Sequence, residues 1–194
     1  MECINGLFAM ITIFLDMDGL LVDIVSAVAG LYGMTAEKVY LRWEPGFYEI
    51  AEGVSHFNIP KEEIWPKVAA QPAEFWGDMK PYPWAKELYE ECQKIAPTYF
   101  LTAPIRCPAC LAGKLQWIYR FAGEGSTNYI MTKHKHFCAA PGRVLVDDSE
   151  KNCFAFDQAG GHSILFPARW NRLHPIANDP RKIEKILKEI RGQG

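Results

Sequence analysis

Acidic side chains follow two short apolar runs of this sequence, and a threonine follows a third. Asp16-Met17-Asp18-Gly19 comes after Ile13-Phe14-Leu15, and Asp147-Asp148 comes after Val144-Leu145-Val146. Thr102 follows the third run. Carboxylates in one small volume repel one another unless a hard cation neutralises them, and Mg²⁺ prefers a few carboxylates while keeping waters and a phosphate oxygen as further ligands. If the fold brings these residues together, they favour a Mg²⁺ site that acts on a phosphate group.

Buried strands of a parallel sheet would bring these residues together. Short apolar stretches alternate with amphipathic segments, which predicts an α/β fold: a Rossmann-like parallel sheet with helices on both faces. The carboxyl ends of parallel strands share one edge, where ligands bind. A single aspartate there could equally cap a helix or turn, but three similar strand ends favour a common site. The expected strands are Ile11–Leu15, Thr98–Leu101, Tyr129–Met131, Arg143–Val146 and Ser163–Phe166, and the expected helices are Asp23–Tyr32, Tyr82–Ile95, Lys114–Phe121, Phe154–Ala159 and Arg181–Arg191.

The stretch from residue 33 to residue 79 has a different composition from the rest of the chain. It is rich in aromatic residues and prolines, has helical patterns at Ala36–Arg42 and Lys61–Ala70, and contains no convincing parallel strand. We therefore expect a small helical cap, inserted directly after the first acidic motif. Residues 10–32 and 80–194 would form the catalytic core, and the residues before Met10 would form a disordered extension.

The overall composition favours a globular protein and disfavours a protein that binds polyanions. Of 194 residues, 49% are hydrophobic and 23% are charged, and the formal net charge is −2. This balance provides material for a core and disfavours binding to nucleic acid polymers or anionic membranes. The apolar run Leu7–Leu15 is shorter than the roughly 20 residues that span a bilayer, and no basic segment precedes it. We expect a cytoplasmic protein.

Two cysteines offer a competing interpretation. Cys107-Pro108-Ala109-Cys110 has the spacing of a zinc knuckle, and His134, His136 and Cys138 follow. Zn²⁺ takes four such ligands in a tetrahedron. The sequence lacks a second Cys-x-x-Cys pair, so the signal is weak, and a redox pair is weaker still. A zinc-binding structural or interaction module remains an alternative, and such a zinc could coexist with an enzyme.

The ordered set of motifs resembles the haloacid dehalogenase (HAD) superfamily of phosphotransferases. Asp16-Met17-Asp18-Gly19 is similar to its first motif, Thr102 to its second, and Asp147-Asp148 to its fourth. The third motif is a lysine upstream of the fourth, for which both Lys133 and Lys135 qualify. The resemblance extends from Ile11 to Phe166 and implies a HAD-like core.

This resemblance implies a role for each residue. Asp16 would attack phosphorus and form an aspartyl phosphate, and Asp18 would protonate the leaving oxygen and later deprotonate the attacking water. Thr102 would donate a hydrogen bond to a phosphoryl oxygen, and Lys135 would place a positive charge beside it. The implied Mg²⁺ ligands are Asp16, Asp18 through its backbone carbonyl, and Asp147 or Asp148.

Within this superfamily, the sequence looks like the 5′(3′)-deoxyribonucleotidases, which hydrolyse nucleoside monophosphates. The local matches are Asp16–Asp23, Phe75–Pro81, Thr102–Arg106 and Lys114–Ile118. The resemblance therefore implies a (deoxy)nucleoside monophosphate as the small-molecule substrate. It leaves open the base, the sugar, and whether the phosphate is 5′ or 3′.

The same matches suggest which residues bind substrate. Phe75 and Trp76 would stack on the base, with Trp43, Phe47 and Tyr48 as weaker candidates. These aromatic residues could instead form the core of the cap itself, and cationic residues at the phosphate entrance could be ordinary surface charge. Ala103 departs from the family pattern, which has serine there. The remaining substrate-binding candidates are Ala103, Arg106, Lys114 and Lys133.

Two further alternatives concern function. A HAD-type phosphatase for a non-nucleotide phosphomonoester would keep the same catalytic residues and differ only in its cap. A catalytically inactive relative is disfavoured because Asp16, Asp18, Thr102, a lysine and Asp147 are all present. A homodimer is compatible with either enzyme.

Overall fold

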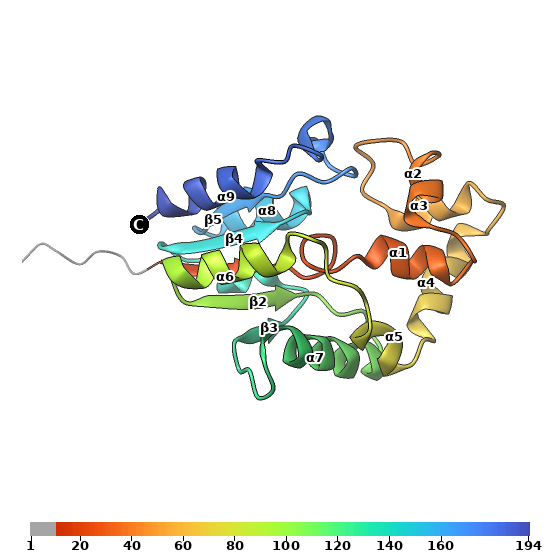
Figure 1. Cartoon of the computed structure of the whole chain (residues 1–194), viewed down its shortest axis with the longest axis horizontal. Coiled ribbons are helices and arrows are strands. Elements are labelled where there is room, and N and C mark those ends of the chain that lie inside the picture. The colour runs from red at the N-terminus through yellow and green to blue at the C-terminus, as the bar shows by residue number, and fades with distance from the viewer. Residues whose placement is uncertain (1–10) are drawn as a thin grey trace, which may run out of the picture.

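The sheet at the centre of the molecule is fully parallel. The computed structural model describes residues 11–194, so the extension expected before Met10 lies outside them. In this part of the chain, five strands pair in the order β3-β2-β1-β4-β5 (Figure 1). All four pairings are parallel, which confirms the predicted α/β class. The strands are β1 (Thr12–Leu15), β2 (Thr98–Thr102), β3 (Tyr129–Met131), β4 (Arg143–Asp147) and β5 (His162–Leu165).

The register of the sheet aligns the ends of its three central strands. Leu15 at the end of β1 lies opposite Phe100 of β2 on one side and Val146 of β4 on the other. The residues that follow Leu15 therefore emerge beside Thr102 and Asp147, which end β2 and β4.

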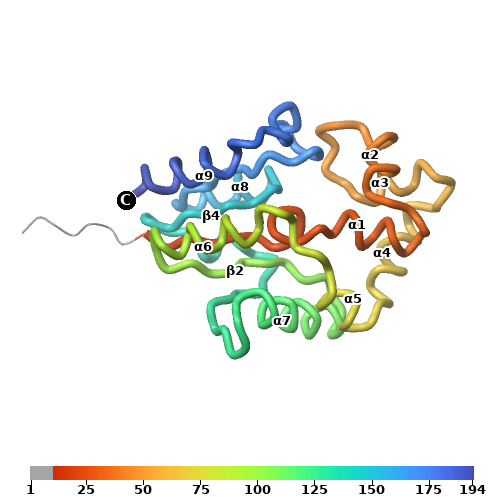
Figure 2. The backbone as a smooth tube through the Cα atoms, in the orientation of Figure 1, coloured from red at the N-terminus to blue at the C-terminus, as the bar shows by residue number. Residues whose placement is uncertain are grey.

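Alternation along the strands divides the apolar residues between two cores. Ile13 and Leu15 belong to the larger core, whereas Phe14 packs with Leu101, Leu145 and Phe156 in a smaller one. Successive strand residues point to opposite faces, so both faces of the sheet are covered by helices. Figure 2 shows α6 and α9 running side by side, and the two helices are in contact. The helices around the sheet are α6 (Ala85–Ile95), α7 (Pro108–Ala122), α8 (Glu150–Gln158) and α9 (Lys182–Arg191), with the short 3₁₀ helices η1 (Lys135–Cys138) and η2 (His174–Ile176).

Residues 33–79, which we call the cap segment, contain helices and no strand of the sheet. With α1 (Ile24–Gly30), they gather at the end of the molecule opposite the C-terminus (Figure 1). The last of these helices, α5, packs against α7 of the sheet region. The division into core and cap remains our proposal. The helices of the segment are α2 (Ala36–Tyr40), α3 (Ile50–Ser55), α4 (Lys61–Ala69) and α5 (Ala73–Gly77).

The backbone that precedes α1 pairs with the backbone that follows the cap segment. The Asp23 N–H donates to the Lys80 carbonyl at 2.9 Å, and the Tyr82 N–H donates to the Leu21 carbonyl at 2.8 Å. The Asp23 carboxylate also caps α1 by accepting from the Ser26 N–H at 3.0 Å. These bonds fix the base of the cap segment directly beside the turn that follows β1.

Two helices start earlier than predicted because their capping residues were overlooked, and α6 starts later than predicted. Helix α7 begins at Pro108 rather than Lys114, because the Cys107 thiol caps it and proline suits the first helical turn. Helix α8 begins at Glu150 rather than Phe154, because Ser149 provides its N-cap. Helix α6 begins at Ala85 rather than Tyr82. Of the helices in residues 11–194, none has the length and apolar character needed to cross a bilayer.

Candidate active site

The structure brings the acidic strand ends together. Asp16, Asp147 and Asp148 each offer a carboxylate oxygen, and these oxygens lie within 4.8 Å of one another. All three residues are buried. Thr102, the last residue of β2, is buried at the same edge of the sheet. The common site that the strand ends predicted is therefore present, and we call Asp16, Asp147 and Asp148 the acidic group.

Lys135 holds two members of the acidic group. Its Nζ lies 2.7 Å from Asp16 Oδ1 and 2.6 Å from Asp147 Oδ2. Burial alone would disfavour the ammonium, but the charges of the two carboxylates outweigh it and raise the pKa of Lys135. The lysine is therefore a fixed positive charge. Lys133, the other candidate for this position, is exposed to solvent.

Asp16 is held through one of its two oxygens. Oδ1 accepts from the Met17 N–H at 2.7 Å and from Lys135, whereas Oδ2 accepts no hydrogen bond from residues 11–194. Burial raises the pKa of Asp16 to about 7, Lys135 opposes this shift, and the charges of Asp147 and Asp18 add to it. A nearby cation would therefore strongly favour the ionised form.

The two aspartates after β4 have different surroundings. Asp147 uses both oxygens: the Ser149 N–H donates to Oδ1 at 2.8 Å, and Lys135 and Asn152 donate to Oδ2 at 2.6 and 3.1 Å. Asp148 accepts one bond, from Trp170 Nε1 to Oδ2 at 2.5 Å.

Asp148 Oδ1 is buried and has no hydrogen-bond partner among the described residues. Burial and the charges of Asp147 and Asp16 raise the pKa of Asp148 in the absence of a cation. A buried carboxylate oxygen without a donor is costly, and a bound cation would remove that cost. Asp148 thus offers the free ligand atom, while Asp147 anchors Lys135.

A second buried lysine organises the other side of the site. Lys114 Nζ donates to Asp18 Oδ2 at 2.7 Å and to Thr102 Oγ1 at 3.0 Å. The Asp18 carboxylate therefore turns toward Lys114 and does not join the acidic group. Lys114 was expected at the phosphate entrance, but it lies within the site and links two of the predicted catalytic residues.

Gly19 permits the tight turn after β1. Its φ of +82° is a left-handed conformation that suits glycine. A Cβ at this position would collide with the Asp148 carboxylate and with the Trp170 ring. The glycine therefore allows the first motif, Asp148 and Trp170 to approach one another.

Asp148 of the acidic group borders a cavity of about 240 Å³ between the sheet edge and the cap segment. Its lining includes Asp18, Ala103 and Asp148, and five of its thirteen lining residues are aromatic. A largely apolar cavity with a few charged groups at one end suits a ligand that is apolar at one end and charged at the other. The aromatic lining residues are Trp43, Tyr48, Trp65, Trp76 and Trp170.

Not every predicted substrate-binding residue reaches this cavity. Trp76 and Ala103 line it, but Phe75 lies outside the lining and packs edge-on against Trp76, with ring centroids 5.2 Å apart. Arg106 and Lys133 are exposed and also lie outside the lining. The position of the cavity therefore does not support the predicted contacts of Phe75, Arg106 and Lys133 with substrate.

Among the weaker aromatic candidates, Tyr48 lines the cavity and interacts with the charges of the acidic group. The residue is 56% exposed, yet its hydroxyl is close enough to feel the charges of Asp148 and Asp16. Desolvation there, together with the charges of Asp148 and Asp16, raises the pKa of Tyr48. Trp43 also lines the cavity, whereas Phe47 does not.

Sequence reasoning missed Trp65, Glu49 and Trp170 as parts of the site. Trp65 Nε1 donates to Glu49 Oε1 at 3.1 Å, and both residues line the cavity. Trp170 follows the last strand and binds Asp148. None of them stands in a motif, so only their aromatic or acidic character could have suggested them.

The two cysteines of the Cys-x-x-Cys pair lie at the start of α7. The Cys107 thiol accepts from the Cys110 N–H at 3.2 Å and caps α7. In residues 11–194, the acidic group is the only set of three or more potential ligands close enough to share an ion. The spacing of Cys107 and Cys110 therefore reflects a helix start.

Two solved structures with a similar fold are HAD hydrolases. A HAD-like hydrolase from Streptococcus pneumoniae has a TM-score of 0.57 and 15% identity, with 93% of this chain and 98% of that chain covered. A HAD-superfamily hydrolase of subfamily IA from Geobacter sulfurreducens has a TM-score of 0.53 and 17% identity, with 82% and 88% covered. At this identity the similarity establishes the fold, which is the HAD fold. No curated protein matches the sequence.

The family follows from the sequence itself. Residues 9–179 match the family described as 5′ nucleotidase, deoxy (pyrimidine), cytosolic type C protein. This match covers most of the chain, so the protein belongs to that family. It is a phosphoric monoester hydrolase of the 5′-nucleotidase type, as the motifs implied.

Proposed function

We propose that this protein is a Mg²⁺-dependent phosphatase that hydrolyses nucleoside monophosphates through an aspartyl phosphate on Asp16. The observation that carries the proposal is the unpartnered Oδ1 of Asp148, buried in a group of three carboxylates at the end of an aromatic cavity. Family membership supports the nucleotide substrate.

The acidic group fits a hard divalent cation. Its three buried carboxylates lie within 4.8 Å of one another, and the nitrogen and sulfur ligands that favour zinc are absent from this group of described residues. Asp16, Asp148 Oδ1 and the Asp18 backbone carbonyl would hold Mg²⁺, with Asp147 acting through Lys135. Mg²⁺ would offset the charge on the transferring phosphoryl group and favour ionised Asp16.

In the first step, Asp16 attacks phosphorus and the ester bond to the leaving oxygen breaks. Lys135 and the Thr102 hydroxyl would bind phosphoryl oxygens and stabilise the charge that spreads over them. Asp18 would donate a proton to the leaving oxygen, so that the products are a nucleoside and an aspartyl phosphate.

In the second step, water attacks the aspartyl phosphate. Asp18, which has just lost its proton, would accept one from the attacking water. The acyl–phosphate bond breaks, inorganic phosphate leaves and Asp16 is regenerated. Lys114, in contact with both Asp18 and Thr102, would hold these two residues in position through the cycle.

The cavity supports a nucleoside as the leaving group. Tyr48 and Trp65 are the aromatic residues of the lining with accessible surface, whereas Trp43 and Trp76 are almost fully buried. A base could stack on the accessible rings, and such stacking tolerates different bases. We therefore infer that Tyr48 and Trp65, rather than Phe75, contact the base.

Phosphate release from a substrate panel tests this proposal. The panel contains deoxyribonucleoside and ribonucleoside 5′- and 3′-monophosphates, together with sugar phosphates and phosphoglycolate, each with Mg²⁺ and with a chelator. We expect release from nucleotides that requires Mg²⁺. Asp16→Asn should reduce it at least about 10³-fold because the nucleophilic charge is lost while the shape is kept.

Asp179→Asn is a matched control, since Asp179 is an aspartate paired with the exposed Lys185 and lies outside the cavity lining. It should leave the rate unchanged. Full activity of Asp16→Asn would contradict the proposed nucleophile. Strong activity on sugar phosphates with none on nucleotides would support the alternative, a HAD-type phosphatase for a non-nucleotide phosphomonoester.

A further inference from the structure

Trp170 lies between the acidic group and the cap segment. Its indole N–H donates to Asp148 Oδ2 at 2.5 Å, and the side chain is buried. Its ring stacks on that of Trp43 in the cap segment, with centroids 5.5 Å apart and planes 10° from parallel. One side chain thus contacts both a carboxylate of the acidic group and an aromatic ring of the cap segment.

The loop that carries Trp170 is fixed to the same two regions. Asn171 Nδ2 donates to the Asp148 backbone carbonyl at 2.8 Å. On the other side, Arg169 Nη2 donates to the Trp43 carbonyl at 3.0 Å, and the Gly46 N–H donates to the Arg169 carbonyl at 2.9 Å. A displacement of this part of the cap segment would therefore move the loop, and Trp170 with it.

The orientation of the Asp148 carboxylate depends on this one donor. Within residues 11–194, Trp170 Nε1 is the only group that donates to the Asp148 side chain. Without it, neither oxygen would accept a hydrogen bond from these residues. Residues that hydrogen-bond to a metal ligand commonly fix its orientation, and their loss weakens metal binding about 10- to 100-fold.

We propose that Trp170 is a positioning residue that aims Asp148 Oδ1 at the metal and couples metal binding to the docking of the cap segment through Trp43. The inference rests on the Mg²⁺ site in the proposed function, but not on the identity of the substrate. It predicts that a substitution in the cap segment, which removes none of the oxygen ligands of the metal, alters the affinity for the cation.

Direct Mn²⁺ binding to the substrate-free full chain tests the proposal, because Mn²⁺ takes the same oxygen ligands as Mg²⁺ and its free form is measured by electron paramagnetic resonance. Trp170→Phe keeps an aromatic ring but removes the N–H. We expect its dissociation constant for Mn²⁺ to rise at least about 10-fold. Trp117→Phe is the matched control: Trp117 is also buried and donates to the Met79 carbonyl at 2.9 Å, away from the acidic group. Its Mn²⁺ affinity should stay within about 2-fold of wild type.

Trp43→Leu tests the coupling between metal binding and the docking of the cap segment. It also provides a second test of the proposal if Trp170→Phe fails to fold. It leaves the Trp170 N–H and all carboxylates in place, and we expect about 3-fold weaker Mn²⁺ binding or more. Unchanged binding in Trp170→Phe would overturn the positioning role, and unchanged binding in Trp43→Leu would overturn the coupling. A wild-type protein that binds no Mn²⁺ would overturn both, whereas tight Mn²⁺ binding without activity on nucleotides would refute only the substrate assignment.

Discussion

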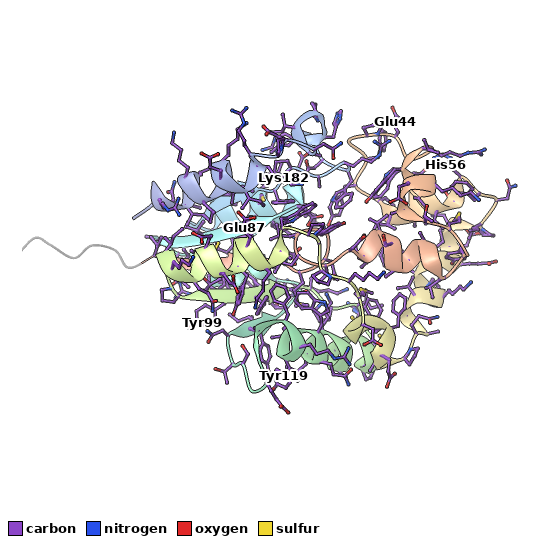
Figure 3. All side chains as sticks on the ribbon, in the orientation of Figure 1. Glu44, His56, Glu87, Tyr99, Tyr119 and Lys182 are labelled. Carbon is purple, nitrogen blue, oxygen red and sulfur yellow. The ribbon has the colours of Figure 1, made fainter. Side chains whose placement is uncertain are left out.

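Two lysines of this protein are buried to a similar degree but in opposite environments. Lys135 is 2% exposed and lies between Asp16 and Asp147. Lys182, at the start of α9 and labelled in Figure 3, is 9% exposed. Its Nζ lies 3.6 Å from the centroid of the Trp84 ring and donates to the Ala177 carbonyl at 2.8 Å. In residues 11–194 it forms no ion pair.

The pKa values of the two lysines therefore move in opposite directions. At Lys135 the two carboxylates outweigh the effect of burial, and the pKa rises. At Lys182 no carboxylate opposes the effect of burial, which lowers the pKa to about 8. The comparison teaches that burial by itself does not identify a catalytic lysine. The charged partners do, because they keep the ammonium protonated where phosphate would bind.

The largest effect in this comparison is expected from Lys135→Met. The substitution leaves Asp16 and Asp147 buried without their cation, and removes the positive charge beside the phosphoryl group. We expect kcat/KM for a nucleotide to fall roughly 10²- to 10³-fold, and the free energy of unfolding without metal to fall by about 3–5 kcal/mol. Steady-state kinetics and urea unfolding measure the two effects. Activity near wild type would remove Lys135 from the catalytic residues.

A second prediction concerns the pH dependence of the metal-free protein. The pKa of Asp16 is about 7 in the folded state against an ordinary value of 3.8, so the folded state binds more protons than the unfolded state between these values. The contribution of Asp16 to stability is therefore full below pH 3.8 and lost as the pH rises toward 7. Asp16→Asn lacks this titration, so its free energy of unfolding relative to wild type should increase from pH 4 to pH 7. Urea unfolding at several pH values, with chelator present, checks the sign.

Mg²⁺ should reverse part of this loss in wild type at pH 7, because it favours the ionised carboxylates and binds the folded state. Asp16→Asn should show a smaller gain. Equal stabilisation of the two proteins by Mg²⁺ would argue that Asp16 is not a ligand.

The smallest effect is expected from Lys182→Met, the same substitution at the second lysine of this comparison. At pH 7 the loss of the cation–π contact opposes the relief of burying a charge, so we expect stability within about 1 kcal/mol of wild type and unchanged kcat/KM. The folded pKa is about 8 and the ordinary value is 10.5, so the unfolded chain binds more protons in this window. The stability of wild type should therefore rise relative to Lys182→Met as the pH increases from 8 to 10. A difference in free energy of unfolding that does not change between pH 8 and pH 10 would contradict a buried Lys182 without an ion pair.

The sequence predicted the sheet and its acidic edge because strand ends carry a strong local signal. Asp16, Thr102 and Asp147 each end a short apolar run, and parallel pairing brings those ends together. The motif order left both Lys133 and Lys135 as candidates for the catalytic lysine. The structure places the Nζ of Lys135 beside Asp16, whereas Lys133 is exposed.

The cavity walls could not be predicted in the same way. Phe75 and Trp76 are adjacent in sequence, yet only Trp76 lines the cavity, because neighbouring residues of a short helix point in different directions. Trp170 lies 22 residues beyond Asp148, and their hydrogen bond depends on the turn after β5 rather than on a motif. Long-range contacts of this kind leave no periodic pattern in the sequence.

The central claim, that Asp16 becomes phosphorylated, is tested most directly with Asp18→Asn and p-nitrophenyl phosphate. This leaving group departs without a proton, so the variant should still form the aspartyl phosphate, but it lacks the base that activates water for the second step. With Mg²⁺ present, we predict a burst of p-nitrophenolate that approaches one equivalent per active site, and mass spectrometry of the acid-quenched protein should locate the phosphoryl group on Asp16. Sustained turnover without a burst, or a phosphoryl group on any other residue, would contradict the account.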